Sequence, residues 1–176
     1  MTTIEILNSI SDSLAHVDNK LYQGYYHWLE EFVRITCPKT VVELGTYEGG
    51  STVYLLGGLP PKSKLITIDI DNNYDLLRGN TDPRLTIITG DDLSDEVWGQ
   101  VPDNIDLLFI DTNHTSEQAF KELQKYSEKF SPKCFVVLDD IHLPEMENFW
   151  TAITKIKYDI SEWHGSGFGL VVYGGS

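Results

Sequence analysis

Apolar residues recur at helical spacing through the first part of the chain. One helical face, in residues 3–17, carries Ile4, Leu7, Leu14 and Val17. A second face, in residues 20–36, carries Leu21, Tyr25, Trp28, Leu29, Phe32 and Val33. Pro38 disfavours helical backbone at the residue before it, so the second segment ends there. The pattern predicts two amphipathic helices, which form an N-terminal cover over residues 1–37.

After residue 40 the pattern changes to short apolar runs that alternate with polar stretches of helical length. The runs are rich in valine and isoleucine, and they occupy residues 41–44, 65–68, 85–88, 105–110 and 135–138. The helical stretches between them are residues 50–58, 73–79, 93–99 and 115–130. Continuous apolar strands that alternate with helices are typical of a parallel sheet covered on both faces. Such sheets bind ligands at the carboxyl ends of their strands.

The last part of the chain has a different pattern. A helical stretch at 144–156 precedes two strand-like runs, at 158–163 and 168–173, with a glycine-rich turn at 165–167 between them. Two runs joined by such a turn predict a β-hairpin, and therefore antiparallel strands at the sheet edge. The predicted fold class is α/β: a doubly wound, mostly parallel sheet of seven strands with a C-terminal antiparallel hairpin, preceded by two helices. We expect a single domain over residues 1–176.

The chain is strongly acidic, with 13 Lys and Arg against 27 Asp and Glu among 176 residues, and a formal charge of −14. An acidic surface repels phosphate backbones, so we expect no nucleic-acid partner. It suits cationic ligands and metal ions. The N-terminus lacks a basic, apolar leader, and no apolar run reaches the ~18–20 residues of a membrane span. We therefore expect a cytoplasmic protein without a membrane segment, in which Cys37 and Cys134 stay reduced.

A glycine-rich loop follows the first predicted strand, from Glu43 to Ser51. Its glycines allow tight turning, and free backbone N–H groups lie at the start of the next helix. It is not a P-loop, because no Gly-Lys-Ser/Thr follows. It is not a dinucleotide fingerprint either, because Tyr47 stands where that motif needs glycine. The loop is therefore a candidate ligand-binding loop of another kind, with the candidate residues Glu43, Gly45, Thr46, Tyr47, Gly49 and Ser51.

Acidic residues follow the next two predicted strands. Asp69 ends the second strand, about 20 positions after the loop, where an acid commonly accepts hydrogen bonds from ribose hydroxyls. Asp91 and Asp92 end the third strand. One of this pair is expected to cap the next helix, and the other to accept a hydrogen bond from an adenine amino group. Together with the loop, Asp69 indicates a ligand that contains a ribose.

Carboxylates and histidines gather after the fourth and fifth strands. Asp111 and His114 follow the fourth strand, and the fifth is followed by Asp139, Asp140 and His142. Neighbouring parallel strand ends bring the three carboxylates together, and these repel one another unless a cation joins them. An oxygen-rich cluster suits Mg²⁺, Mn²⁺ or Ca²⁺ better than zinc. The alternative is a set of helix caps and solvated carboxylates with exposed histidines.

The remaining histidines and the aromatic residues of the second helix have simpler interpretations. We expect three histidines on the surface or on helix faces: His16, His27 and His164. Four aromatic residues are interpreted as core or interface packing, with a substrate lid as the alternative: Tyr22, Tyr25, Tyr26 and Trp28.

The ordered set of these motifs resembles a known family. Residues 41–51 are similar to motif I of class I S-adenosylmethionine-dependent methyltransferases. Four further segments follow in the family's order and spacing: residues 65–71, 85–92, 107–114 and 136–141. The resemblance is greatest to small-molecule O-methyltransferases of the catechol O-methyltransferase type. The sequence also resembles a bacterial group that includes cephalosporin-hydroxylase-like and sugar O-methyltransferase proteins. The resemblance covers residues 40–173, and it implies a Rossmann-like core closed by a hairpin.

The resemblance implies a cofactor site for S-adenosylmethionine. Residues that match the contacts of its methionine half are Glu43, Gly45, Tyr47 and Ser51, within a loop that also holds Thr46 and Gly49. Asp69 matches the ribose-binding acid, with Ile70 beside the adenine. Asp92 falls where the family contacts the adenine edge, and Asp91 is the neighbouring candidate.

The resemblance also implies a metal site. The Mg²⁺ ligands of metal-dependent members match Asp111, Asp139 and Asp140, and Asp111 borders the cofactor as well. His114 stands where the catechol enzymes carry a lysine base, which is a departure from their pattern. Lys133-Cys134 replaces the usual glycine pair before the fifth strand, which implies only a different turn.

Several functions remain open at this point. The leading hypothesis is an O-methyltransferase that acts on a small hydroxylated acceptor, such as a sugar or a secondary metabolite, with help from Mg²⁺. Its general base is expected to be His114, with His142 as the alternative. A metal-independent methyltransferase and a cofactor-binding module without catalysis are the other hypotheses, and an NAD or nucleotide-sugar enzyme fits the loop least. The expected partners are a small-molecule acceptor and, as one arrangement, a second copy of the chain in a homodimer.

Overall fold

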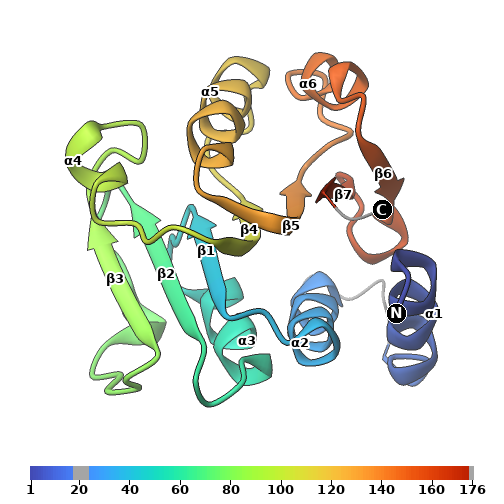
Figure 1. Cartoon of the computed structure of the whole chain (residues 1–176), viewed down its shortest axis with the longest axis horizontal. Coiled ribbons are helices and arrows are strands. Elements are labelled where there is room, and N and C mark those ends of the chain that lie inside the picture. Colours follow the sequence, from blue (N-terminus) through green and yellow to red (C-terminus); the bar gives the residue numbers. More distant parts are fainter. Residues whose placement is uncertain (18–23, 175–176) are drawn as a thin grey trace.

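A single sheet of seven strands lies at the centre of the protein (Figure 1). The structure is a computed structural model, and it describes residues 1–17 and 24–174. The strands are β1 Thr40–Leu44, β2 Lys64–Asp69, β3 Leu85–Thr89, β4 Ile105–Ile110, β5 Phe130–Asp139, β6 Ile156–Asp159 and β7 Phe168–Gly174. Each of the five predicted parallel runs falls within one of the strands β1 to β5.

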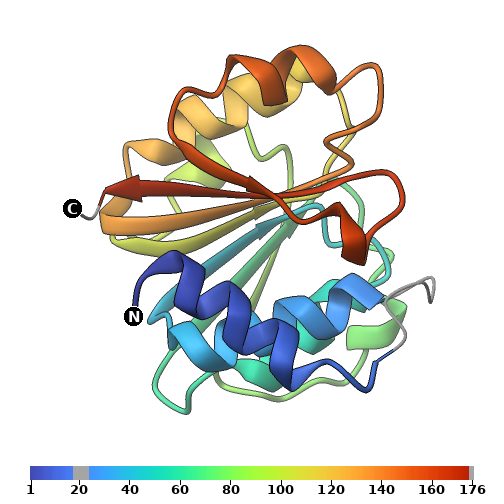
Figure 2. The same ribbon diagram turned by 90° about the vertical axis from the view of Figure 1, so that its right-hand side faces the viewer.

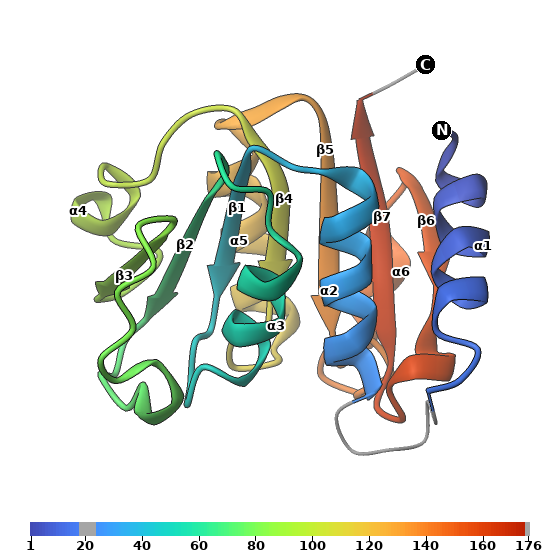
Figure 3. The ribbon, with the colours of Figure 1, turned by 90° about the horizontal axis from the view of Figure 1, so that it is seen from below.

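The strands follow the order β3-β2-β1-β4-β5-β7-β6. All neighbours from β3 to β5 are parallel, whereas β7 is antiparallel to both β5 and β6. In Figure 3 the arrows of β1, β2, β4 and β5 accordingly point one way and that of β7 the other. This arrangement confirms the predicted fold class: a doubly wound, mostly parallel sheet with a C-terminal antiparallel hairpin at its edge.

Helices cover both faces of the sheet, which lies between two helical layers in Figure 2. One layer contains α1 Thr3–Ser13, α2 Gly24–Thr36 and α3 Gly50–Gly58, and the other contains α4 Asp95–Trp98, α5 Ser116–Ser127 and α6 Glu147–Ala152. Two short 3-10 helices complete the set: η1 Asp75–Leu77 and η2 Ser161–Trp163. None of the helices in the described parts of the chain is long and apolar enough to cross a membrane.

Successive strand residues point to opposite faces of the sheet, which explains why the parallel strands are apolar throughout. Val41 and Leu107 pack into the cluster on the side of α2, while Val42 and Leu108 pack into the cluster on the side of α5. All four side chains have zero exposure. The core therefore has two halves, and the carboxyl ends of the strands lie between them at one edge.

Local polar residues shorten several predicted helices. The predicted helix at 3–17 ends at Ser13, and the first residues of the one predicted at 20–36, including Tyr22, lie outside the described residues. The segment 73–79 forms only η1, because aspartates and asparagines favour turns over helix interiors. Here Asp69 Oδ1 accepts the N–H of Asp71.

The C-terminal hairpin begins earlier than its sequence pattern indicates. The helix predicted at 144–156 is limited to α6, and β6 starts at Ile156. Asp159 ends β6, because its carboxylate accepts both the N–H and the hydroxyl of Ser161. Residues 161–163, predicted as strand, therefore form η2, and the chain returns through the glycine-rich turn into β7.

Candidate active site

A cavity of about 840 Å³ opens at the carboxyl ends of β1, β2, β3, β4 and β5. Most of the residues singled out in the sequence line it: Gly45, Thr46, Tyr47, Ser51, Asp69, Ile70, Asp91, Asp92, Asp111, His114, Asp139 and Asp140. Three of the candidates do not line it: Glu43, Gly49 and His142. The topology thus brings together side chains that are far apart in the sequence, as expected for the ends of parallel strands.

The loop after β1 passes very close to the end of β4. Gly45 has a φ of +92°, and a Cβ at this position would lie 1.8 Å from the carbonyl oxygen of Asp111. Only glycine is compatible with both conditions. Gly49, also at positive φ, caps the start of α3. The loop can therefore turn tightly along the cavity wall.

Glu43 fixes this loop from behind the cavity wall. Its carboxylate is fully buried and accepts three hydroxyl groups, those of Ser51 at 2.5 Å, Thr52 at 2.5 Å and Thr67 at 2.7 Å. Burial raises the pKa of Glu43, and the three hydroxyl donors oppose that rise. Its observed contacts tie β1 to β2 and to the start of α3.

Asp69 closes the next side of the cavity at the end of β2. Its Oδ2 accepts the N–H of Tyr47 at 2.7 Å, and its Oδ1 accepts the N–H of Asp71 at 3.0 Å. Each oxygen keeps a further acceptor position, because a carboxylate has about four. The neighbouring Ile70 is 71% exposed and adds an apolar surface to the cavity wall.

Asp91 and Asp92 have separate roles after β3. Asp91 is exposed, and its Oδ1 accepts the N–H of Leu93 in the turn that leads to α4. Ser94, rather than Asp91 or Asp92, caps that helix. Asp92 is buried at the cavity wall, where the amide of Gln118 donates to its Oδ1 at 3.2 Å.

A second buried acid, Glu122, lies behind Asp92 on α5. Its Oε1 accepts the hydroxyl of Thr112 and the amide of Gln118, both at 2.8 Å. Burial and the neighbouring Asp92 raise the pKa of Glu122 to about 8, and burial also raises the pKa of Asp92. Gln118 and Glu122 were not predicted as site residues, although they lie on the same face of α5 as the buried Ala119 and Leu123.

We define the acid cluster as Asp111, Asp139 and Asp140. Burial and the charge of Asp139 raise the pKa of Asp111 well above its ordinary value. Asp139 is 4% exposed, and the Oδ1 atoms of Asp139 and Asp140 are buried with no hydrogen-bond partner among the described residues. Buried, unpaired carboxylate oxygens are costly. The donor set therefore fits a bound divalent cation.

Two imidazoles contact the acid cluster. His114 Nδ1 is 3.1 Å from Asp140 Oδ2, and its Nε2 is 3.8 Å from Asp111 Oδ1. His164 Nε2 is 3.4 Å from Asp139 Oδ1, and this contact raises the pKa of His164. The backbones of His114 and Asp140 have φ values of +51° and +57°, in the left-handed region that non-glycine residues adopt uncommonly.

The structure corrects the expected position of His164. His164 was expected on the surface or on a helix face, yet it lines the cavity. His142 is exposed and pairs with Asp159 at 2.7 Å, away from the cavity lining. The cause is the hairpin: β7 pairs antiparallel with β5, so that Phe168 lies opposite Asp139 and the turn before it lies over the strand ends. That pairing is the signal that could have placed His164 near the acid cluster.

The other interpretations of histidines and aromatic residues agree with the structure. His16 is exposed, and His27 is half-buried on α2 against Tyr54. Trp28 belongs to the core. Tyr25 and Tyr26 combine packing with a position in the cavity wall.

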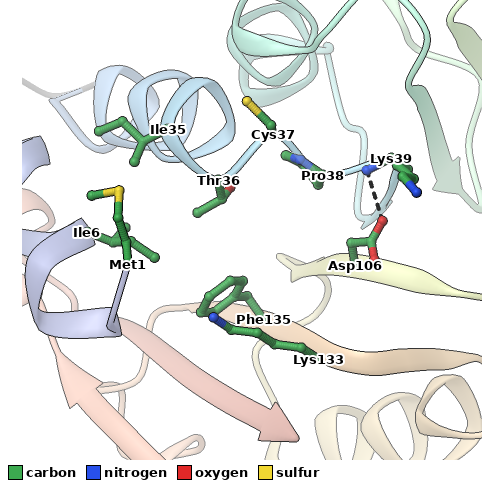
Figure 4. Close-up of a pocket in the computed structure, with 10 residues that line it drawn as sticks. All are labelled: Met1, Ile6, Ile35, Thr36, Cys37, Pro38, Lys39, Asp106, Lys133 and Phe135. Atoms are coloured by element: carbon green, nitrogen blue, oxygen red, sulfur yellow. Dashed lines mark hydrogen bonds between the residues drawn. The ribbon is translucent and has the colours of Figure 1, made fainter. Parts of the chain in front are cut away.

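A second cavity of about 380 Å³ lies at the opposite ends of the strands (Figure 4). Apolar side chains make up half of its lining residues, and Cys37 and two lysines are among the others. Its acidic residue, Asp106, already accepts the N–H groups of Lys39 at 2.8 Å and Thr40 at 3.1 Å. Acidic side chains, imidazoles and the glycine-rich loop come together in the larger cavity. That cavity is therefore the candidate active site.

The sequence profile of a family described as Methyltransferase domain matches residues 42–141, which is more than half of the chain. The chain belongs to the methyltransferase-domain family. The matched segment begins in β1 and ends just after β5, so it includes the loop, Asp69, Asp92 and the acid cluster. The methyltransferase-domain match thus covers most of the candidate active site, whereas His164 lies beyond it.

Two curated relatives of this methyltransferase domain carry O-methyltransferase in their names. The chain is 27% identical over 121 residues to O-methyltransferase hkm8 of Aspergillus hancockii, covering 64% of this chain and 47% of that protein. It is 35% identical over 72 residues to the Transmembrane O-methyltransferase homolog of Mus musculus, covering 41% of this chain and 26% of that protein. The chain therefore spans less than half the length of these relatives.

Solved structures share the fold at low identity. A methyltransferase from Geobacter sulfurreducens superposes with a TM-score of 0.72 at 16% identity, covering 97% of this chain and 89% of that one. The O-methyltransferase TomG from Streptomyces achromogenes, in complex with S-adenosylmethionine (SAM), superposes with a TM-score of 0.69 at 17% identity. The match covers 97% of this chain and 90% of TomG. An O-methyltransferase from Bacillus cereus, in complex with S-adenosylhomocysteine (SAH), superposes with a TM-score of 0.69 at 16% identity. The match covers 98% of this chain and 92% of that one. These likenesses show a common fold.

Proposed function

We propose that this protein transfers a methyl group from S-adenosylmethionine to a hydroxyl oxygen of a small acceptor, with help from a divalent cation. The observation that carries the proposal is the arrangement of the larger cavity. The glycine loop and the acids suited to a nucleoside lie along β1, β2 and β3, and the acid cluster with His114 lies next to them at β4 and β5. Family membership and the O-methyltransferase relatives support the same reaction.

The cofactor would lie along the first three strand ends. The further acceptor positions of Asp69 suit ribose hydroxyls, and Ile70 offers an apolar surface for the adenine. Asp92 and Gln118 would contact the polar edge of the base. The loop residues that line the cavity, among them Gly45 and Ser51, suit the amino-acid end, because a glycine-rich loop before a helix offers backbone N–H groups. TomG and the Bacillus cereus enzyme have SAM and SAH bound, respectively, on the same fold.

The acid cluster would hold Mg²⁺ or another divalent cation, because two of its buried oxygens have no partner among the described residues. When bound, such a cation binds the acceptor hydroxyl, lowers its pKa and orients its oxygen. The protein supplies the carboxylates and a cavity wall that positions the acceptor against the cofactor. Methyl transfer is an in-line displacement, so this positioning is a large part of the catalysis.

His114 is the proposed general base. Its Nδ1 faces Asp140 Oδ2 at 3.1 Å, a contact that favours a proton on Nδ1 and leaves Nε2 to accept one. Imidazole is suited to proton transfer at neutral pH. His142 pairs with Asp159 away from the cavity lining, so the geometry favours His114 over this alternative.

The proposed acceptor is a small hydroxylated molecule, such as a sugar or a secondary metabolite. Tyr25, Tyr26 and Tyr47 border the cavity and offer aromatic surface to such a compound. A cytoplasmic location and a homodimer belong to the same proposal. The free thiols of Cys37 and Cys134 support the first, and light scattering in solution tests the second.

A metal-independent methyltransferase is the second candidate. The observation in its favour is that His114 and His164 can offset the charge of the acid cluster without a cation. Calorimetry with S-adenosylmethionine, S-adenosylhomocysteine and NAD, each with and without Mg²⁺, tests the cofactor assignment. Screening metabolite extracts for methylated products, in excess chelator and after Mg²⁺ is restored, separates the two candidates. Full activity in excess chelator favours the metal-independent one.

A further inference from the structure

His164 lies in the segment between β6 and β7 and approaches the acid cluster from there. Its Nε2 lies 3.4 Å from Asp139 Oδ1 and 3.9 Å from Asp140 Oδ1. One ligand atom from each of Asp139, Asp140 and His164 can be chosen so that all three lie within 4.8 Å of one another. Ligands around one ion at bond lengths of about 2.1 Å are separated by about 3.0 Å when adjacent and about 4.2 Å when opposite. The two imidazole–carboxylate distances fall within that range.

A second observation on the same two oxygens also points to a bound ion. Asp139 Oδ1 and Asp140 Oδ1 are buried, and neither has a hydrogen-bond partner among the described residues. The side chain of Asp139 is only 5% exposed. In each carboxylate the unpaired Oδ1 is also the oxygen that His164 Nε2 approaches, at 3.4 Å for Asp139 and 3.9 Å for Asp140, so the space between these three atoms is a candidate point for a bound ion. A cation at that point would satisfy all three groups.

The imidazole of His164 is held in place before any ion binds. It stacks on the ring of Tyr25, with centroids 4.4 Å apart and planes inclined by 10°. The turn that carries it is fixed as well, because Gly167 has a φ of +104° and a Cβ there would lie 2.5 Å from the backbone nitrogen of His142. A ligand positioned in this way loses little freedom on binding.

We propose that His164 is a nitrogen ligand of the cation site formed with Asp139 and Asp140, and that the site prefers a first-row transition ion to Mg²⁺. The inference rests on the cation-binding part of the proposed function. Mg²⁺ requires oxygen ligands in near-octahedral geometry, whereas imidazole suits the transition ions. Mn²⁺ and Co²⁺ accept both ligand types, so a mixed oxygen and nitrogen site selects them.

The test uses the whole protein and three ions added singly: Co²⁺, Mn²⁺ and Mg²⁺. His164→Phe keeps an aromatic ring against Tyr25 and removes the nitrogen, and His142→Phe is the matched control outside the cavity lining. By calorimetry, we expect His164→Phe to weaken Co²⁺ binding at least tenfold and Mg²⁺ binding less than twofold, with His142→Phe unchanged. Equal losses for both ions, or none, would overturn the inference.

Pulsed electron paramagnetic resonance of the Mn²⁺-loaded wild type gives a readout that depends on no variant. A directly bound imidazole nitrogen couples to the Mn²⁺ spin, and we expect this coupling in the wild type and in His142→Phe but not in His164→Phe. No coupling in the wild type, or a coupling lost in His114→Phe and kept in His164→Phe, contradicts the assignment. S-adenosylmethionine binding measured on the same samples shows separately whether the proposed methyltransferase function fails.

Discussion

Asp69 differs from the other acids of the cavity, because both of its oxygens already accept backbone N–H groups and keep room for one acceptor contact each. Changing Asp69→Asn removes its charge and one acceptor oxygen. We expect S-adenosylmethionine affinity to fall by about 1–3 kcal/mol, the usual loss when a hydrogen bond to a charged group is removed. Isothermal titration calorimetry measures this. Asp71→Asn, at an exposed neighbouring position, is the control and should bind like the wild type.

The second prediction for a single residue concerns His114, the proposed base. We expect His114→Asn to lower kcat by about 10²–10⁴-fold while cofactor affinity stays nearly unchanged, because a positioned base acts only in the chemical step. Asparagine is the suitable replacement, since it tolerates the φ of +51° better than alanine does. The control is His142→Asn. Normal turnover in both variants would exclude His114 and His142 as the base.

The polar residues at the strand ends could be predicted from the sequence. Which of their side chains contact one another in the cavity could not. The sequence places Asp69, Asp92 and Asp111 at the cavity because each follows a strand, and the structure agrees. It cannot show that Asp92 shares its site with Glu122, since α4, β4 and the first half of α5 separate the two in the chain. The position of His164 depends on how the hairpin pairs with β5, which is a property of the sheet.

Among the elements, we expect the loop between β1 and α3 to tolerate substitution least. In Gly45→Ala, the new Cβ would lie 1.8 Å from the Asp111 carbonyl oxygen and the backbone would keep a φ of +92°. We expect a loss of stability well beyond the ~1–2 kcal/mol of left-handed strain, together with loss of cofactor binding. Denaturant unfolding and calorimetry measure the two effects.

Gly79 provides the control for that prediction. It also has positive φ, at +75°, but a Cβ there would meet nothing within 4 Å. Gly79→Ala should therefore show the strain alone, about 1–2 kcal/mol, and bind the cofactor normally. Equal losses in the two variants would mean that the contact with Asp111 does not limit the loop.

The parallel core was more predictable than the ends of the chain. Runs such as Val41–Leu44 have no polar residue on the face toward either helical layer except the buried Glu43, so their period and length identify them as strands. The boundaries of β6 depended on Asp159, whose contacts with Ser161 end the strand. Side-chain contacts of this kind leave little trace in hydrophobic patterns.

At the scale of the whole molecule, buried acids make folding depend on pH. The pKa of Glu122 is about 8 in the folded protein, above the ordinary 4.5 that it would have when unfolded. Between these values the folded state holds a proton that the unfolded state lacks. Stability from this group is therefore present at low pH and is lost as the pH rises towards about 8. Asp111 and Asp92, whose pKa values are also raised, act in the same direction.

Replacing Glu122 by glutamine isolates its share of that dependence. The groups facing it are the Asp92 carboxyl, the Gln118 amide and the Thr112 hydroxyl, and a glutamine amide can donate to the first without carrying charge. As the pH rises from 5 to 8.5, we expect the free energy of unfolding of Glu122→Gln to increase by about 1 kcal/mol or more relative to that of the wild type. Denaturant unfolding across that pH range measures it.

Glu117→Gln is the control on the same helix. Its side chain is 80% exposed and pairs with Lys121, which lowers its pKa, so it should follow the wild-type pH dependence. Parallel curves for Glu122→Gln and the wild type would show that the buried pair with Asp92 stays fully ionised.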